Sequence, residues 1–217
     1  MTRGPWYQIL RIGFGLLTLI AIMVQLRIAI DEHGAMASNF FSFFTIESNL
    51  LTVVVLLLGA VLALWGYETS LGWELFRGAV AAYMTTTFIV FAALLSGLPD
   101  NLDLTEPWVN FVLHQLMPIV VVLDWVFSPP QHRLTIRQAL VWIAFPAAYC
   151  VYSLIRGPIV EWYPYPFLNP DAAGGYPGVI AYSIGIAVLF IGIVWFVVTI
   201  GAWAREWWAT RAHPASP

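Results

Sequence analysis

Six long apolar runs constrain this chain more than any other feature of its sequence. Each run can cross the hydrocarbon core of a bilayer as a helix, which takes about 20 apolar residues. Lipid cannot satisfy free backbone groups, and the short alternating segments of a membrane β-barrel do not occur in the sequence. We therefore predict an all-α, polytopic transmembrane helical bundle with six spans. The runs are approximately Trp6–Ala29, Phe40–Trp65, Glu74–Ser96, Trp108–Phe127, Thr135–Arg156 and Tyr176–Trp203.

The composition is consistent with lipid as the solvent. Of the 217 residues, 60% are hydrophobic and 10% are charged, whereas a soluble protein carries about 25% charged residues. The chain has no Lys and no basic cluster, so we expect no nucleic-acid partner. A single cysteine, Cys150, excludes a disulfide framework. We expect one domain over residues 1–208 and a short, polar, disordered tail over 209–217.

The arginines predict the orientation of the bundle. Seven of the nine fall on one side, and only Arg27 and Arg156 fall on the other. Under the positive-inside rule both termini are then cytoplasmic, in a multi-pass protein of the cell (plasma or inner) membrane. The acidic third loop, LPDNLDLTEP, agrees with an outer location. Tryptophans near the ends of the runs predict an interfacial belt made of Trp6, Trp65, Trp73, Trp108, Trp125, Trp162 and Trp203.

A polar stripe marks the second run. Ser42, Thr45, Ser48, Asn49 and Thr52 are three or four residues apart, which places them on one helical face. We expect this face to point into the bundle. Such residues often join neighbouring spans or bond to their own helix, so the stripe alone does not indicate catalysis.

His114 is the only histidine inside a predicted span, and Asn110 precedes it by one turn. No other His or Cys stands at ligand spacing, so we expect no metal and no haem. Thr45 and His114 both lie roughly 8–9 Å below the predicted outer boundary. If their two spans are neighbours, the imidazole and the hydroxyl can form an activated nucleophile. A lone histidine that only packs is the simpler alternative.

Four other polar residues are candidates for supporting roles. Glu47 lies on a different face from Thr45, and Asp124 lies about 15 Å deeper than His114. We expect Asp124 to be solvated at the inner interface, which leaves Asn110 as the best candidate to orient His114. Arg156 could bind a carboxylate or lipid phosphate, or extend to the interface.

The fifth loop, 157–175, contains WYPYPFLNP. Its prolines restrict the backbone, while Trp162, Tyr165 and Phe167 supply apolar area. Loops of this kind lie in the membrane interface or cover a cavity. Anchoring at the surface and contact with a substrate both remain open.

Three segments resemble the androgen-induced and androgen-dependent TFPI-regulating membrane proteins and their bacterial six-span relatives. FFSFFTIESNLL is similar to the family segment with the nucleophilic threonine, which corresponds to Thr45. WVNFVLHQLMP is similar to the segment with the catalytic histidine, and matches it at Trp108, Asn110 and His114. YPFL, from Tyr165 to Leu168, matches a further family signature, as does an acid ten residues after the histidine, here Asp124. The animal members hydrolyse fatty acid esters of hydroxy fatty acids, so the resemblance implies ester hydrolysis without metal or cofactor.

We therefore expect a membrane-embedded threonine hydrolase whose partners are a lipid ester substrate and membrane lipids. Thr45 attacks the carbonyl, and His114 is the general base and then the general acid. Candidates for stabilising the oxyanion are Asn49, Asn110 and Ser48. Candidates for contacting the substrate are Arg156, Trp162, Tyr165, Phe167 and Glu47.

Two other functions remain open. In a transporter or lipid-binding scaffold, the same stripe would line a pathway, and in a structural subunit it would only pack. Transporters often have interrupted helices. Apart from Pro118, the second and fourth runs read as continuous around Thr45 and His114, which weakly favours a fixed catalytic site.

Overall fold

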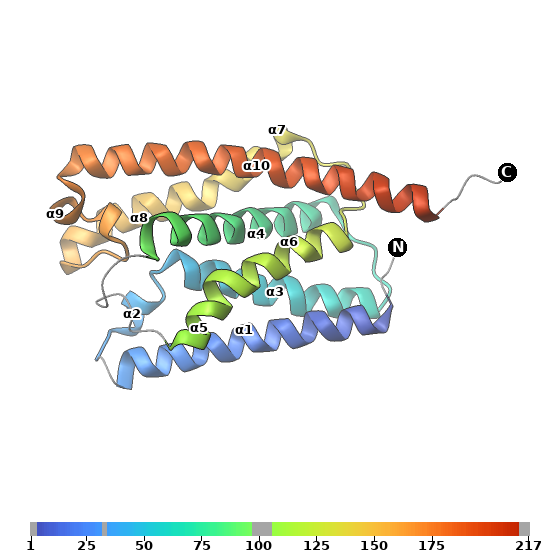
Figure 1. Cartoon of the computed structure of the whole chain (residues 1–217), viewed down its shortest axis with the longest axis horizontal. Coiled ribbons are helices and arrows are strands. Elements are labelled where there is room, and N and C mark those ends of the chain that lie inside the picture. The colour runs from blue at the N-terminus through green and yellow to red at the C-terminus, as the bar shows by residue number, and fades with distance from the viewer. Residues whose placement is uncertain (1–3, 32–33, 97–105, 213–217) are drawn as a thin grey trace.

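The computed structural model describes residues 4–31, 34–96 and 106–212. Six helical segments of this part are long and apolar enough to cross a membrane, and it contains no strand. The predicted six-span, all-α bundle is thus confirmed, and each predicted run overlaps one observed span. Both termini lie at one end of the bundle (Figure 1). We call that end the terminal end and the opposite one the distal end. The spans are Pro5–Asp31, Phe44–Leu64, Leu71–Leu95, Pro107–Phe127, Ile136–Val160 and Tyr176–Arg211.

Several spans are built from consecutive helical segments. The first half of the chain forms α1 (Pro5–Asp31), α2 (Ala37–Phe40), α3 (Phe44–Leu64), α4 (Leu71–Val90) and the π-helical η1 (Phe91–Leu95). The second half forms α5 (Pro107–Phe111), the π-helical η3 (Val112–Leu116), α6 (Met117–Phe127), α7 (Ile136–Ala139), the 3₁₀ helix η4 (Leu140–Ile143), α8 (Ala144–Val160), the 3₁₀ helix η5 (Pro166–Leu168), α9 (Pro170–Ala173) and α10 (Tyr176–Ala212).

The central helix of the bundle is α4, which packs against α3, α6 and α10. Small residues let these neighbours approach closely, as is common between membrane helices. A Cβ atom on Gly78 would lie 2.5 Å from the ring of Trp142. Ser70 caps α4 by accepting a hydrogen bond from the backbone N–H of Trp73. In contrast, the span formed by α7, η4 and α8 is the least buried of the six.

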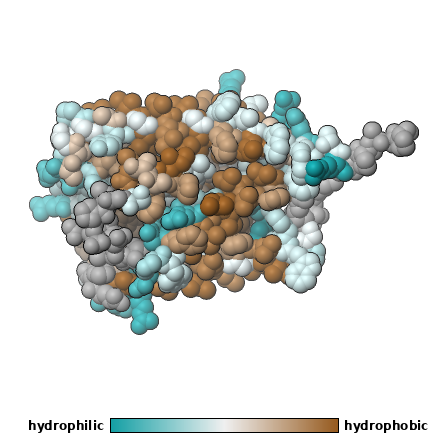
Figure 2. All heavy atoms as spheres, viewed as in Figure 1, coloured by the Kyte–Doolittle hydropathy of each residue, from teal (hydrophilic) through white to brown (hydrophobic). Residues whose placement is uncertain are grey.

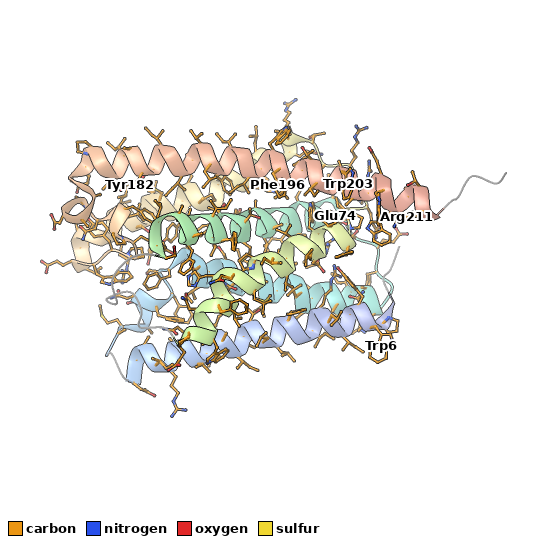
Figure 3. All side chains as sticks on the ribbon, in the orientation of Figure 1. Trp6, Glu74, Tyr182, Phe196, Trp203 and Arg211 are labelled. Atoms are coloured by element: carbon orange, nitrogen blue, oxygen red, sulfur yellow. The ribbon has the colours of Figure 1, made fainter. Side chains whose placement is uncertain are left out.

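The surface has the pattern expected of a membrane protein. Figure 2 shows apolar residues over much of the middle of the visible face and more hydrophilic ones toward its two ends. Trp6 and Trp203 are exposed near the terminal end (Figure 3), as the predicted belt requires. Trp125 is an exception, because it is buried and its Nε1–H donates to the carbonyl of Val197. Its assignment to the interfacial belt was wrong.

An ion-pair network at the terminal end corrects the prediction for Asp124. Arg11 donates from Nε and Nη2 to the two carboxylate oxygens, at 2.6 and 3.0 Å, and Arg77 donates to Oδ2 at 3.1 Å. The hydroxyl of Tyr7 donates to the same carboxylate at 2.8 Å. Asp124 is only 8% exposed, so the expectation that it is solvated was wrong. The network joins α1, α4 and α6, and Arg77 also pairs with Glu74.

Two further predictions concern the connecting and terminal segments. Helix α10 continues to Ala212, so the predicted disordered tail is helical over 209–212. Residues 213–217 and most of the acidic third loop lie outside the described residues.

Candidate functional site

The second span begins four residues later than predicted. Helix α2 ends at Phe40 and α3 begins at Phe44, so the helix expected to run continuously from Phe40 is interrupted. Tertiary hydrogen bonds satisfy the chain at this break. The carbonyl of Ser42 accepts from the hydroxyl of Tyr149 at 2.9 Å, and Ser42 Oγ lies 2.8 Å from the hydroxyl of Tyr152. Thr45 therefore lies in the first turn of α3, where a backbone N–H has no partner within the helix.

The polar stripe points into the bundle, as predicted, and all five of its residues are buried. Asn49 makes the contact that matters most, because its Nδ2 donates to the carbonyl of Thr45 at 2.9 Å and to that of Leu113 at 3.1 Å. The segments carrying Thr45 and His114 are thus neighbours. Both N–H groups of Asn49 are used, so neither is left for an oxyanion. Ser48 Oγ and Asn49 Oδ1 are buried and have no hydrogen-bond partner in the described part of the chain.

Tyr165 contacts Thr45 from the fifth loop. Its hydroxyl oxygen accepts from the backbone N–H of Thr45 at 3.3 Å and lies 3.4 Å from Thr45 Oγ1. The ring stacks on that of Phe167, with 5.0 Å between centroids, and meets Phe43 edge-on. Burial raises the pKa of the Tyr165 hydroxyl above its usual value, so the group stays protonated. It can donate this proton to Thr45 Oγ1 or to a ligand.

Thr45 and Tyr165 line a cavity of about 380 Å³. Most of its wall is aliphatic or aromatic, and it is formed by α3, α4, η1, η4, α8, the η5 loop and α10. Thr87 also lines it, and its Oγ1 is buried with no hydrogen-bond partner among the residues described. A ligand that fits this chamber carries an apolar chain and a small polar group. The polar residues that line the cavity are Thr45, Thr86, Thr87, Tyr149, Cys150, Tyr165 and Ser183.

His114 is held in one tautomer. Its Nδ1 lies 3.2 Å from the carbonyl oxygen of Asn110, which can only accept, so Nδ1 carries the proton. The lone pair of Nε2 is then free to act as a base. Asn110 orients the imidazole as expected, but through its backbone and not its side chain. Any residue type at position 110 could supply this carbonyl.

Phe91 separates His114 from the cavity. The two rings stack with 4.1 Å between centroids and an interplanar angle of 23°. Phe91 lines the cavity, whereas His114 does not. No hydrogen bond joins His114 to Thr45 in the described structure.

The stacked pair joins two π-helical segments, because Phe91 opens η1 and His114 is the middle residue of η3. Such segments are rare and often occur at functional sites. Pro118 gives a physical reason for η3. It has no N–H, so it cannot bond to the carbonyl of His114 four residues earlier. The expected continuous helix is thus altered at His114, and only Pro118 signals this in the sequence.

The other predicted contact residues divide into two groups. Tyr165 and Phe167 line the cavity, whereas Arg156, Trp162 and Glu47 do not. Arg156 donates to Asn39 Oδ1 at 2.5 Å and lies over the ring of Trp162. It therefore fastens α8 to α2. Glu47 is half-buried.

Comparisons with protein families, curated proteins and solved structures find no match to this chain. Within the described ranges, no group of three or more His, Cys, Asp or Glu side chains could hold a metal ion.

Proposed function

We propose that this protein is an integral membrane hydrolase of fatty acid esters, with Thr45 as the nucleophile and His114 as the base. The observation that carries the proposal is the placement of the Thr45 hydroxyl and the Tyr165 hydroxyl together on the wall of an apolar chamber. The resemblance of the segments around Thr45 and His114 to a family of threonine hydrolases supports the same chemistry.

The reaction proceeds through an acyl-enzyme. Thr45 Oγ1 attacks the ester carbonyl and passes its proton to Nε2 of His114. The tetrahedral intermediate collapses, the leaving alcohol takes that proton, and the acyl group stays on Thr45. A water molecule then attacks the acyl-threonine and gives a proton to Nε2 of His114. When the bond from the acyl carbon to Thr45 Oγ1 breaks, His114 returns this proton to Oγ1, and the fatty acid leaves.

Tyr165 stabilises the oxyanion in this proposal. Its hydroxyl donates to the developing negative charge, and the positive end of the α3 dipole adds to the field there. Asn49 is not the donor, because both of its N–H groups bind backbone carbonyls. Asn49 instead keeps α3 against η3.

The Phe91 ring must move for proton transfer to occur. In the described structure this ring covers one face of the imidazole and forms part of the cavity wall. When an ester enters the chamber, Phe91 leaves its stack and His114 Nε2 approaches Thr45 Oγ1. The two residues that move, Phe91 and His114, belong to the π-helical segments η1 and η3.

Turnover of a long-chain fatty acid ester by the purified protein in nanodiscs tests the proposal. Wild type should hydrolyse the ester, and Thr45→Ala and His114→Ala should each lower kcat by at least a hundredfold. Thr85→Ala is the matched control, since Thr85 bonds to the carbonyl of Ala81 and does not line the cavity. Persistence of turnover in Thr45→Ala would reject the mechanism.

A lipid-binding or transport protein without catalysis is the second candidate. The break between α2 and α3 and the absence of His114 from the cavity wall favour it. This function predicts that proteoliposomes take up or retain a long-chain lipid without hydrolysing it. Release of free fatty acid that depends on Thr45 excludes this candidate.

A further inference from the structure

The wall of the chamber reaches the lipid-facing surface between α8 and α10. Val151 of α8 and Ile191 of α10 both line the chamber, and they are 57% and 55% exposed. Ala147 and Ala187 line it too and are also exposed. Because these four residues belong to membrane spans, their exposed surface contacts lipid.

Helices α8 and α10 make few contacts with each other. The residues that face each other are small: Cys150 Sγ lies 3.9 Å from Ser183 Oγ. The span that contains α8 is the least buried of the six, whereas α10 packs closely against α4 on its other side. Separating α8 from α10 therefore breaks few contacts.

We propose that the acyl chain of a bilayer lipid enters the chamber sideways through this α8–α10 opening, defined by Ala147, Cys150, Val151, Ser183, Ala187 and Ile191. The inference rests on the proposed function for the fate of the lipid, and it assigns the substrate to lipids already dissolved in the membrane. The chamber and the bilayer core are both apolar, so the acyl chain passes from one to the other without exposing its surface to water. The ester group then reaches Thr45 and Tyr165, which line the same chamber.

A reversible bridge across the opening tests this route. Ser183→Cys places a second thiol opposite Cys150, and a short bis-methanethiosulfonate reagent can join the two. The probe is a fluorescent long-chain ether, which cannot be hydrolysed, added in vesicles to protein carrying Thr45→Ala. We expect the bridge to slow binding of the probe at least tenfold, and reduction with dithiothreitol to restore it. Ser183→Ala treated with the same reagent is the control, because it carries the modification on Cys150 without a bridge.

A second control concerns a groove on the other side of α10. Gly185 lies there, and a Cβ atom at this position would have no other atom within 4 Å. Gly185→Leu should leave binding of the probe unchanged. A loss of binding in Gly185→Leu, together with normal binding to the bridged protein, would move the entrance to that groove.

The test separates this inference from the proposed function. If wild type hydrolyses no ester, the proposed function fails, while slower binding of the ether to the bridged protein still supports the opening. If wild type hydrolyses a long-chain ester and the bridge changes neither turnover nor binding, the lateral route is wrong and the chemistry stands.

Discussion

The Tyr165 hydroxyl contacts both the backbone N–H and the side-chain hydroxyl of Thr45. Replacing Tyr165 with Phe removes the hydroxyl and keeps the ring that stacks on Phe167. Loss of one oxyanion donor costs about 10²–10³-fold in kcat. We expect a decrease of that size in Tyr165→Phe, with little change in KM. The thermal transition should fall modestly, because the backbone N–H of Thr45 loses its acceptor. An unaltered kcat would remove Tyr165 from the catalytic machinery.

The pH profile offers an independent check on the same residue. Burial raises the pKa of the Tyr165 hydroxyl above its usual value, which is about 10 for tyrosine. The neutral, donating form thus persists at every pH below that value. Below about pH 10, we therefore expect the pH profiles of turnover for wild type and Tyr165→Phe to have the same shape. A decline near pH 8 that disappears in Tyr165→Phe would contradict the role of a neutral donor.

Asp124 contributes to stability and not to catalysis. Removing its charge leaves Arg11 and Arg77 buried without their common partner, and breaking a buried pair costs about 3–5 kcal/mol. We expect Asp124→Asn to lower the free energy of unfolding by about that amount, measured by denaturant titration in micelles. Asp31→Asn is the matched control, because its pair with Arg27 is exposed and such pairs contribute about 0–1 kcal/mol. Equal stability of the two variants would contradict the structural role.

These residues show how far sequence reasoning reaches at this scale. Residue counting placed Thr45 and His114 at matched depth in two apolar runs, but only the structure makes their segments neighbours, through the Asn49–Leu113 hydrogen bond. It could not place the Phe91 ring against the imidazole, because that contact depends on how η1 packs on η3. Asp124 was misjudged for a similar reason, since its partners are 113 and 47 residues away in the chain.

At the scale of elements, close approach of helices depends on particular glycines. A Cβ on Gly78 would meet the Trp142 ring at 2.5 Å and the Trp125 ring at 3.2 Å. Both rings are buried and cannot move aside freely. Overpacking of a core typically costs about 1–3 kcal/mol, so we expect Gly78→Ala to destabilise the protein by that amount in a thermal melt. Gly192→Ala on α10 meets open space and should not lower the melting temperature.

The spans themselves could be predicted because apolar length alone determines them in lipid. The break between α2 and α3 could not. FFSFF contains no Gly or Pro, and the break is stabilised by Tyr149 and Tyr152, which come from a span more than 100 residues away. The π turn at His114 was not predicted either, although Pro118 was the one exception to a continuous fourth run. Both deviations occur beside the candidate site, where local preference and tertiary structure disagree.

At the scale of the whole molecule, an even number of spans places both termini at one end, and the start of α3, which carries Thr45, lies toward the other. Which side faces the cytoplasm rests on the arginine distribution. Arg11 and Arg77 neutralise carboxylates inside the bundle, so the excess of positive charge depends on the other arginines at the terminal end. That excess still favours a cytoplasmic terminal end under the positive-inside rule.

Cysteine labelling in cells decides this orientation. In a Cys150→Ala background, Asp171→Cys in α9 and Glu68→Cys before α4 introduce single thiols at exposed positions of the distal and terminal ends. A membrane-impermeant maleimide should label Asp171→Cys in intact cells and Glu68→Cys only after permeabilisation. The expected pattern places Thr45 and the α8–α10 opening in the outer leaflet, so the protein would take its lipid from that leaflet. The reverse pattern would transfer the chamber to the cytoplasmic leaflet without changing its geometry, because Thr45 and the α8–α10 opening line the same chamber.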